Sequence, residues 1–347
     1  MRALIVTTVK NEGAFLLEWL AHHRAAGFTD FLVFSNDCAD GTDAMLDRLA
    51  AMGWLCHVPN PGPWPEGPQW AALKAADGHP AVKAADWVLV SDVDEFVTVK
   101  TGDGTLPALL GALPEATAIP LTWRFFGNAG VVAFEDRPVT ETFLRAAPEV
   151  LHWPWRAAMF KTLFRNDGSY RKLGVHRPRS PDTGRMADQR WFDGSGRPLG
   201  GAFVTSRIFS DFGRDNYALV QLNHYALGAM ESYVVKCDRG RANREAGAFD
   251  MAYWVDRNFC GTEDRSADLL GPARRAILAD LKADAVLGAC HASAVHWRRR
   301  RFADLMREEA WRALFGRLLM TPPTRPLSQA EAAPLLAHAI RAQQPEA

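Results

Sequence analysis

The sequence of 347 residues is poor in cysteine and has no excess of charge of either sign. Its five cysteines are scattered, odd in number and without Cys-x-x-Cys spacing. This usage argues against a disulfide framework or a structural zinc site and favours a reducing compartment. The 40 basic and 40 acidic residues cancel, so no overall field attracts nucleic acid. We therefore expect no nucleic-acid partner.

Long apolar runs, internal repeats and low-complexity segments are also missing. No stretch of about 18 uninterrupted apolar residues occurs, which predicts that no helix crosses a membrane. The first residues are basic and then apolar, as in a signal peptide, but Thr7 and Thr8 interrupt the apolar stretch and no cleavage site follows. We expect a first buried strand there and a cytoplasmic protein.

Apolar runs alternate with helical patterns in the first part of the chain. The alternation predicts an α/β fold with a mainly parallel sheet flanked by helices. From residue 272 onward the pattern is helical, which predicts a C-terminal helical extension. Strands are expected at residues 2–9, 31–34, 54–58, 87–90 and 119–123, and helices at 12–26, near 44–53 and from 69 to 76.

Two acidic residues, Asp92 and Asp94, directly follow the apolar run at residues 87–90. Carboxylates two residues apart point the same way from an extended backbone. At the carboxyl edge of a sheet they could grip Mn²⁺ or Mg²⁺ and, through it, a diphosphate. The neighbouring Glu95 is expected to support them. The pair therefore predicts a metal and nucleotide site.

Polar clusters also follow the first and second expected strands, at the same edge of the sheet. The first offers Lys10 and free backbone N–H groups to a phosphate. The second offers Asp37 to a nucleobase or ribose, although turn formation and helix capping explain such residues equally well. The nucleotide-binding residues predicted at these ends of strands are Thr8, Lys10, Asn11, Glu12, Asn36, Asp37 and Asp92.

Later motifs add basic and imidazole groups. His224 is predicted to complete the metal shell with Asp92 and Asp94, and His176 is a competing ligand. Lys236 and Arg239, at helical i, i+3 spacing, would clamp a diphosphate. The aromatic stretch at residues 121–128 is either a platform for a sugar or part of the core.

Two further predictions concern the base and the C-terminal helix. Glu263 or Asp264 is the expected general base, with helix capping as the alternative for Asp264. The basic run at residues 298–301 precedes apolar residues at helical spacing up to 315, which predicts one amphipathic helix. A solvated face is the simpler interpretation, and peripheral contact with a membrane is the alternative.

Taken together, these motifs resemble nucleotide-sugar glycosyltransferases of the GT-A fold, of family 2 type and related to family 92. The resemblance covers residues 3–265 and divides the chain into a nucleotide-sugar-binding half (1–125), an acceptor-side half (126–268) and the extension (269–347). The segments that carry it are Val9-Lys10-Asn11-Glu12, Asn36-Asp37, Asp40-Gly41-Thr42, residues 91–96 and 123–130, Asn223-His224-Tyr225 and residues 236–240.

The resemblance implies a UDP-sugar donor, a Mn²⁺ or Mg²⁺ ion and an inverting transfer to a glycan or lipid-linked acceptor in surface polysaccharide synthesis. It implies that Asp94 coordinates the metal, that Asp92 meets the ribose or the metal, and that Glu12 and Asp37 hold the nucleoside. The acidic base usual after the acceptor segment does not stand out, so Glu263, Asp264, Asp136 and Glu141 all remain candidates.

Two other functions are consistent with the same residues. A nucleotidyltransferase also uses an aspartate-dominated metal site, but it would normally carry a glycine-rich phosphate loop after the first strand, and residues 7–13 are not one. A non-catalytic protein that binds a nucleotide sugar would keep the metal site and use no base.

Overall fold

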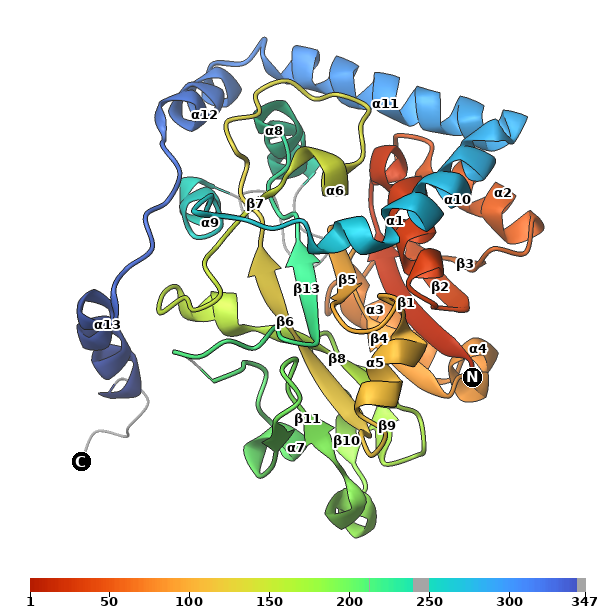
Figure 1. Ribbon diagram of the computed structural model, residues 1–347. Helices are drawn as coiled ribbons and strands as arrows, with labels where there is room; N and C mark the ends of the chain where they lie inside the picture. Colours follow the sequence, from red (N-terminus) through yellow and green to blue (C-terminus); the bar gives the residue numbers. More distant parts are fainter. Residues whose placement is uncertain (212, 240–249, 342–347) are drawn as a thin grey trace.

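The computed structural model of the chain describes residues 1–211, 213–239 and 250–341, and a single large sheet runs through it (Figure 1). This sheet has ten strands. Its main path runs β12-β11-β6-β8-β4-β1-β2-β3; β13 joins this path by pairing with β6, and β5 is attached through its pairing with β13. The predicted α/β fold with a mixed, mainly parallel sheet is confirmed.

The first four strands form the parallel part of the sheet. β1 pairs in parallel with β2 and with β4, and β2 pairs in parallel with β3. The carboxyl ends of these strands therefore meet at one edge, as predicted. The strands are β1 (Ala3–Val9), β2 (Asp30–Ser35), β3 (Cys56–Pro59) and β4 (Trp87–Val90), and the helices between them are α1 (Gly13–Ala25), α2 (Thr42–Ala51), α3 (Pro68–Asp77) and α4 (Pro80–Ala84).

Both faces of the parallel part are covered, which explains why its strands read as continuous apolar runs. Along β1, Ala3 and Ile5 pack into the core that α1 and α2 share. Leu4 and Val6, which alternate with them, pack on the other face against Ala72 of α3. The predicted strand and helix positions in this part of the chain are confirmed to within a few residues.

Strands from later in the chain complete the sheet and make it mixed. β8 lies antiparallel between β4 and β6, and β13 pairs in parallel with β6 and antiparallel with β5. The elements that build this part are β5 (Glu95–Val99), α5 (Leu106–Ala112), β6 (Ala118–Phe125), β8 (Phe160–Arg165), β11 (Trp191–Phe192), β12 (Pro198–Leu199) and β13 (Val220–His224).

Short elements and helices surround this sheet. Two small antiparallel pairs, β10 with β9 and β14 with β7, lie outside it. The short elements are α6 (Val139–Thr142), β7 (Arg145–Ala146), β9 (Tyr170–Lys172), β10 (Arg179–Pro181), α7 (Ala202–Thr205), α9 (Met251–Val255), β14 (Thr262–Glu263) and the 3₁₀ turns Trp155–Ala158, Thr183–Asp188 and Ser266–Leu270. The longer helices are α8 (Met230–Arg239), α10 (Gly271–Ala283), α11 (Ala285–Leu305), α12 (Glu309–Met320) and α13 (Gln329–Arg341).

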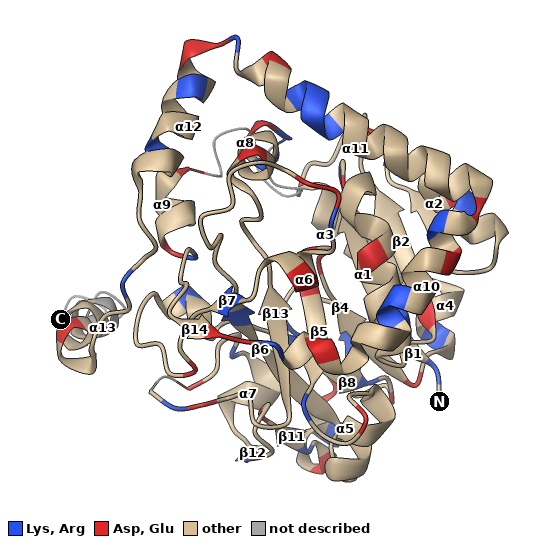
Figure 2. Ribbon diagram, turned by 45° about the horizontal axis from the view of Figure 1, so that its top comes forward, with Lys and Arg blue, Asp and Glu red and all other residues tan. Residues whose placement is uncertain are grey.

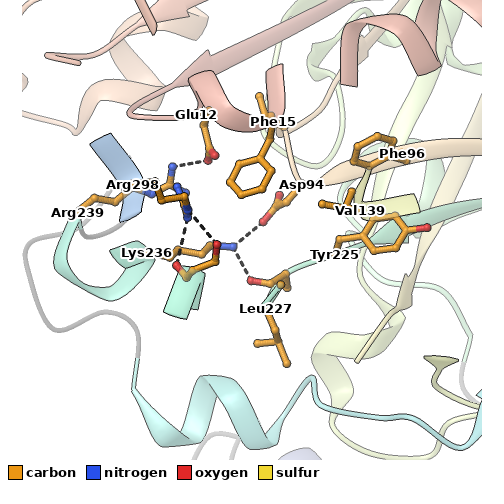
Figure 3. Close-up of a pocket in the computed structure, with 14 residues that line it drawn as sticks. Glu12, Phe15, Asp94, Phe96, Val139, Tyr225, Leu227, Lys236, Arg239 and Arg298 are labelled. Carbon is orange, nitrogen blue, oxygen red and sulfur yellow. Dashed lines mark hydrogen bonds and ion pairs between the residues drawn. The ribbon is translucent and has the colours of Figure 1, made fainter. Parts of the chain in front are cut away.

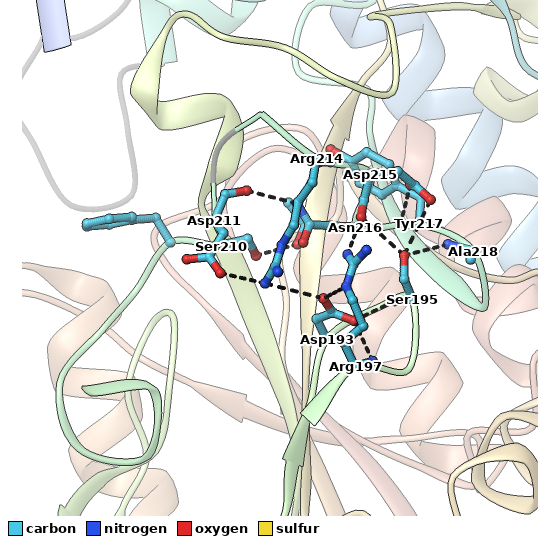
Figure 4. Close-up of polar contacts among 12 residues, drawn as sticks. Asp193, Ser195, Arg197, Ser210, Asp211, Arg214, Asp215, Asn216, Tyr217 and Ala218 are labelled. Carbon is cyan, nitrogen blue, oxygen red and sulfur yellow. Dashed lines mark hydrogen bonds and ion pairs between the residues drawn. The ribbon is translucent and has the colours of Figure 1, made fainter. Parts of the chain in front are cut away.

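A network of charged and polar side chains holds the loop after α7 against β11 and β12 (Figure 4). Asp193 accepts a hydrogen bond from Arg197 (2.7 Å) and pairs with Arg214 at 3.8 Å. From the end of this loop, Tyr217 donates its hydroxyl proton to the carbonyl oxygen of Trp123 (2.9 Å). The network therefore fixes the position of β6 where it approaches the site described below.

The C-terminal helices pack onto the sheet domain. α10 and α11 contact α1, α11 also contacts α2 and α8, and α12 contacts α8 and α9. The predicted single helix through residues 298–315 is wrong, because α11 ends at Leu305 and α12 begins at Glu309. The apolar side chains of this stretch, including Phe302 and Phe315, pack with α8 and α9 in a separate core.

Two of the four arginines in the basic run of α11, a blue segment in Figure 2, make contacts within the protein. Arg298 is buried and Arg301 pairs with Asp238 (2.7 Å). Only Arg299 and Arg300 of the run are exposed, so the basic face that membrane contact would need is reduced to these two residues. No helix in residues 1–211, 213–239 or 250–341 is long and apolar enough to span a bilayer.

Candidate active site

A cavity of about 350 Å³ lies at the carboxyl edge of the sheet. Its volume is within the range typical of small-molecule sites. Segments far apart in the sequence contribute to it, from β1, the β4–β5 turn, β6, β8, β13, α8 and α9. It is lined by Thr8, Lys10, Glu12, Gln69, Asp92, Val93, Asp94, Trp123, Arg156, Met159, Lys161, Val175, His176, His224, Lys236, Arg239, Tyr253 and Arg257.

Most of the residues that we predicted to bind nucleotide or metal line this cavity, but Asn11, Asn36 and Asp37 do not. Asn11 and Asp37 have positive φ angles of 54° and 44°, a conformation that Asn and Asp adopt more readily than most residues. Asn11 accepts a hydrogen bond from the N–H of Ala39 (2.7 Å), and Asn36 accepts one from Asn60 (2.5 Å). In the structure these side chains therefore serve the turns after β1 and β2, with Asp37 exposed.

Asp92 and Asp94 both reach the cavity, although not in the way we expected. β4 ends at Val90 and β5 begins at Glu95, so the expected extended backbone is wrong and the two residues lie in a tight turn. The N–H of Glu95 donates to the carbonyl oxygen of Asp92 (3.1 Å) and closes this turn. The turn directs the two carboxylates to different partners.

Asp92 pairs with a lysine that sequence reasoning missed. Lys161 of β8 donates to the Asp92 carboxylate (3.0 Å) and lies 3.7 Å from the Glu95 carboxylate. Its side chain is only 1% exposed. One feature of the sequence could have revealed this ion pair: a lone lysine in the apolar strand Phe160-Lys161-Thr162-Leu163-Phe164. A lysine at such a buried position needs acidic partners.

Glu95 supports the turn from beneath. Its carboxylate accepts hydrogen bonds from the Ser91 hydroxyl (3.0 Å), the Asp92 N–H (3.0 Å) and the Trp123 indole (2.7 Å). Burial raises the pKa of Glu95 to about 8, against the opposing effect of Lys161. The residue holds Asp92 and Trp123 in place and does not itself line the cavity.

Asp94 faces the opposite wall. Lys236 donates to its Oδ2 atom (2.7 Å), and the Nε2 atom of His224 lies 3.7 Å from the same oxygen. Burial disfavours ionisation of Asp94, but the charge of Lys236 outweighs it and holds the pKa of Asp94 well below its ordinary value. Burial lowers the pKa of His224, so its imidazole is neutral and able to bind a metal.

The distance between Asp94 and His224 suits a divalent cation that enters the cavity bound to the phosphates of a ligand. Two ligands about 2.1 Å from one cation are about 3 Å apart at right angles and about 4.2 Å apart when opposite, and the observed 3.7 Å lies between. Among the described residues, no three His, Cys, Asp or Glu side chains are grouped as a metal cage. Mg²⁺-type ions commonly use one or two carboxylates and complete their shell with phosphates and water.

Positive charge exceeds negative charge around the cavity. On α8, Lys236 also donates to the carbonyl oxygen of Ala226 (2.6 Å), and Arg239 donates to that of Lys10 (2.6 Å) and pairs with the Glu12 carboxylate (Figure 3). No carboxylate of the described residues pairs with Lys10, Arg156 or Arg257. The cations of the lining are Lys10, Arg156, Lys161, Lys236, Arg239 and Arg257, and its acids are Glu12, Asp92 and Asp94. This balance favours an anionic ligand.

Arg257 is a buried cation of the lining that forms no ion pair with a carboxylate of the described residues. It is 5% exposed, stacks on the Tyr253 ring at 3.7 Å, and its buried Nε atom has no hydrogen-bond partner among the described residues. A desolvated guanidinium without an acidic partner is costly, which suits it to a bound anion. No feature of the sequence marked Arg257 or Arg156 as a residue of the cavity.

The predicted base residues lie elsewhere. β14, which contains Glu263, pairs with β7 and not with a strand of the cavity. Glu263 pairs with Arg265 (2.5 Å), and Asp264 accepts hydrogen bonds from Gln221 (2.9 Å) and Ser266 (2.6 Å). The two other candidate bases also form ion pairs, Asp136 with His291 (2.9 Å) and Glu141 with Arg274 (3.2 Å). The structure brings none of these four carboxylates to the cavity lining.

His176 lines the cavity with an imidazole whose two nitrogens can be told apart. Its Nδ1 atom lies 3.0 Å from the carbonyl oxygen of Phe160, which can only accept, so Nδ1 carries the hydrogen. That assignment leaves the Nε2 lone pair of the neutral ring available. Burial, and then the charge of Lys161, lower the pKa of His176 to about 4, so the ring is neutral at physiological pH.

Comparison with known proteins places the chain in the class of glycosyltransferases. More narrowly, residues 6–188, over half of the chain, match the model described as Glycosyltransferase family 92, and the chain belongs to this family. A family 92 protein of Ricinus communis is 33% identical over 104 residues, which is 28% of this chain and 17% of the relative. One of Oryza sativa subsp. japonica is 26% identical over 153 residues, 42% of this chain and 25% of the relative. The chain thus matches a quarter or less of the length of these relatives.

Among solved structures, the S. aureus protein TarS is similar. The fragment TarS 1–349 in complex with UDP is 14% identical, with 88% of this chain and 91% of that chain covered and a TM-score of 0.33. A longer TarS chain is 15% identical, with 88% and 54% covered and the same TM-score of 0.33. A likeness at this level carries no inference about function.

Proposed function

We propose that this family 92 protein transfers a sugar from a nucleotide-sugar donor, with a UDP-sugar as first choice, to a hydroxyl group of a glycan or lipid-linked acceptor. The transfer is inverting, depends on Mn²⁺ or Mg²⁺ and serves the synthesis of a surface polysaccharide. One observation carries the proposal: a single cavity at the carboxyl edge of the sheet joins Asp92 and Asp94 to an excess of cations.

The cations of the cavity suit the charge of a nucleotide sugar. When the bond between sugar and diphosphate breaks, negative charge develops on the leaving diphosphate. Lys236, Arg239 and Arg257, which all line the cavity, would stabilise this charge. A bound divalent ion would neutralise the same charge, and Asp94 and His224 are the residues that would hold it. Thr8 and Lys10, at the end of β1, would face the nucleoside end of the donor.

The acceptor hydroxyl must lose a proton as it attacks the sugar, and we assign this role to His176. Replacing His176 by asparagine is expected to lower kcat about a hundredfold and leave KM for the donor unchanged, since removing a general base typically costs this much or more. The measurement is steady-state kinetics with the donor varied. As a control, His296→Asn on the exposed side of α11 should behave as wild type. Unchanged kcat in His176→Asn, with a large loss in Asp264→Asn, would return the role to the carboxylate.

The proposed function is tested by assaying the purified chain with a panel of UDP-, GDP-, TDP- and ADP-sugars. We expect at least one donor to release its nucleoside diphosphate with transfer to an acceptor sugar, to lose this activity in EDTA and to regain it with added Mn²⁺. Release of pyrophosphate from a nucleoside triphosphate and a sugar phosphate would instead identify a nucleotidyltransferase. Binding of donors without turnover would identify a non-catalytic protein.

A further inference from the structure

α11 inserts a buried arginine beside the cavity. Arg298 is 4% exposed and donates to the hydroxyl (2.9 Å) and the carbonyl oxygen (3.1 Å) of Ser232 on α8. Its guanidinium also lies over the Phe15 ring of α1 at 4.6 Å. Arg298 thus connects the C-terminal extension to two helices that border the cavity (Figure 3).

The surroundings of Arg298 are unusual for a buried charge. No carboxylate of the described residues forms an ion pair with it, and its hydrogen-bond acceptors are neutral. Burial lowers the pKa of Arg298 to about 10, so the group stays charged at neutral pH without a paired acid. A buried, unpaired charge normally destabilises a fold, and hydrophobic residues of similar size usually pack as well. A role beyond packing would explain why an arginine occupies this buried position.

A second contact lies one helical turn further along α11. The Nε and Nη2 atoms of Arg301 donate to the Asp238 carboxylate, at 2.8 and 2.7 Å. Ser232 and Asp238 lie on either side of Lys236 in the sequence of α8. α11 therefore holds α8 before and after the residue that binds Asp94.

α8 also carries two cations, Lys236 and Arg239, toward the cavity. Lys236 reaches Asp94, and Arg239 reaches Glu12 at the start of α1. A small shift or rotation of α8 would move both cations together, because they project from one rigid helix. Displacements of about 1 Å in a group that binds a reacting substrate can cost about a hundredfold in rate.

We propose that Arg298 is a positioning residue that fixes α8 so that Lys236 and Arg239 face the diphosphate of the bound donor. The inference rests on the proposed function and goes beyond it by including the C-terminal extension, which lies outside residues 6–188, in the substrate site. Arg298 acts through α8 and does not touch the ligand. Its loss should weaken recognition of the diphosphate and leave recognition of the nucleoside unchanged.

The experiment compares UDP with uridine as ligands, measured by titration calorimetry at fixed Mn²⁺ concentration. In Arg298→Met, which removes the charge and the hydrogen-bond donors but keeps an unbranched side chain, we expect UDP to bind about tenfold more weakly and uridine to bind as in wild type. Arg298→Lys should recover part of the loss, because an ammonium can still donate to Ser232. Arg300→Met is the matched control, since Arg300 lies on the exposed side of the same helix and should change neither affinity.

The outcomes separate this inference from the function on which it rests. If wild type binds neither UDP nor another nucleoside diphosphate, the proposed function fails. If wild type binds UDP and Arg298→Met binds it equally well, the positioning role is overturned. Equal weakening of UDP and uridine, or a lower melting temperature with unchanged affinities, would assign Arg298 a purely structural role and would also overturn it.

Discussion

Replacing Asp94 by asparagine is expected to lower kcat/KM for the sugar donor about a thousandfold while the protein stays folded. The substitution keeps the shape of the side chain and removes its charge. That charge pairs with Lys236 at 2.7 Å and faces His224 at 3.7 Å. Without it, the proposed cation loses its one carboxylate ligand on this wall of the cavity. Loss of one preorganised electrostatic contact typically costs 10²–10³-fold in kcat, and loss of the ion's contribution adds to it.

The measurement is the rate of nucleoside diphosphate release over a range of Mn²⁺ concentrations, together with a circular dichroism spectrum to verify the fold. Glu115→Gln is the matched control, since this carboxylate is exposed and is not among the residues that line the cavity. Near wild-type activity of Asp94→Asn at every Mn²⁺ concentration would contradict the role assigned to Asp94.

Replacing Lys161 by methionine is expected to lower the free energy of unfolding by about 3–5 kcal/mol, the usual cost of removing one partner from a buried ion pair. Lys161 is almost fully buried and lies between the carboxylates of Asp92 and Glu95. Its loss leaves two acidic groups close together, one of them fully buried, with no cation between them. Methionine fills a similar volume, so the loss reports charge and not packing.

Urea denaturation of the variant and wild type measures this difference. Asp92→Asn introduced into Lys161→Met should restore part of the stability, because it removes the carboxylate charge that the lysine neutralised. Lys172→Met on β9 is the control, and as an exposed substitution it should change stability by less than about 0.5 kcal/mol. A loss below about 1 kcal/mol in Lys161→Met would show that the pair of carboxylates does not depend on the lysine.

The first half of the fold and the acidic part of the site were predictable because they depend on local patterns. Apolar runs in alternation with helices predict a parallel sheet, and parallel strands bring their carboxyl ends to one edge. Thr8 and Lys10 lie at the end of β1 and Asp92 follows β4, and they meet in the cavity for this reason. Lys236 and Arg239 were predictable from their helical spacing and project from α8 toward the same space.

The remaining features depend on tertiary structure that no local pattern encodes. Lys161 reaches Asp92 only because β8 inserts antiparallel between β4 and β6. The turn at Asp92 and Asp94 looks in sequence like the continuation of a strand, since acidic residues are compatible with both. Glu263 was predicted from its position in the chain alone, and the pairing of β14 with β7 takes it away from the cavity.

The pairing of β13 has a consequence for any preparation of this protein. β13 is held between β5 and β6, and its register sets His224 opposite Glu95 and Phe125. Side chains alternate along a strand, so a slip of one residue would turn His224 away from the cavity and present Asn223 or Tyr225 instead. The same slip would move Val220 and Leu222 out of the core and turn the polar side chains of Gln221 and Asn223 into it. The core therefore enforces the register that places His224, and a variant that keeps its melting temperature also keeps this cavity residue in place.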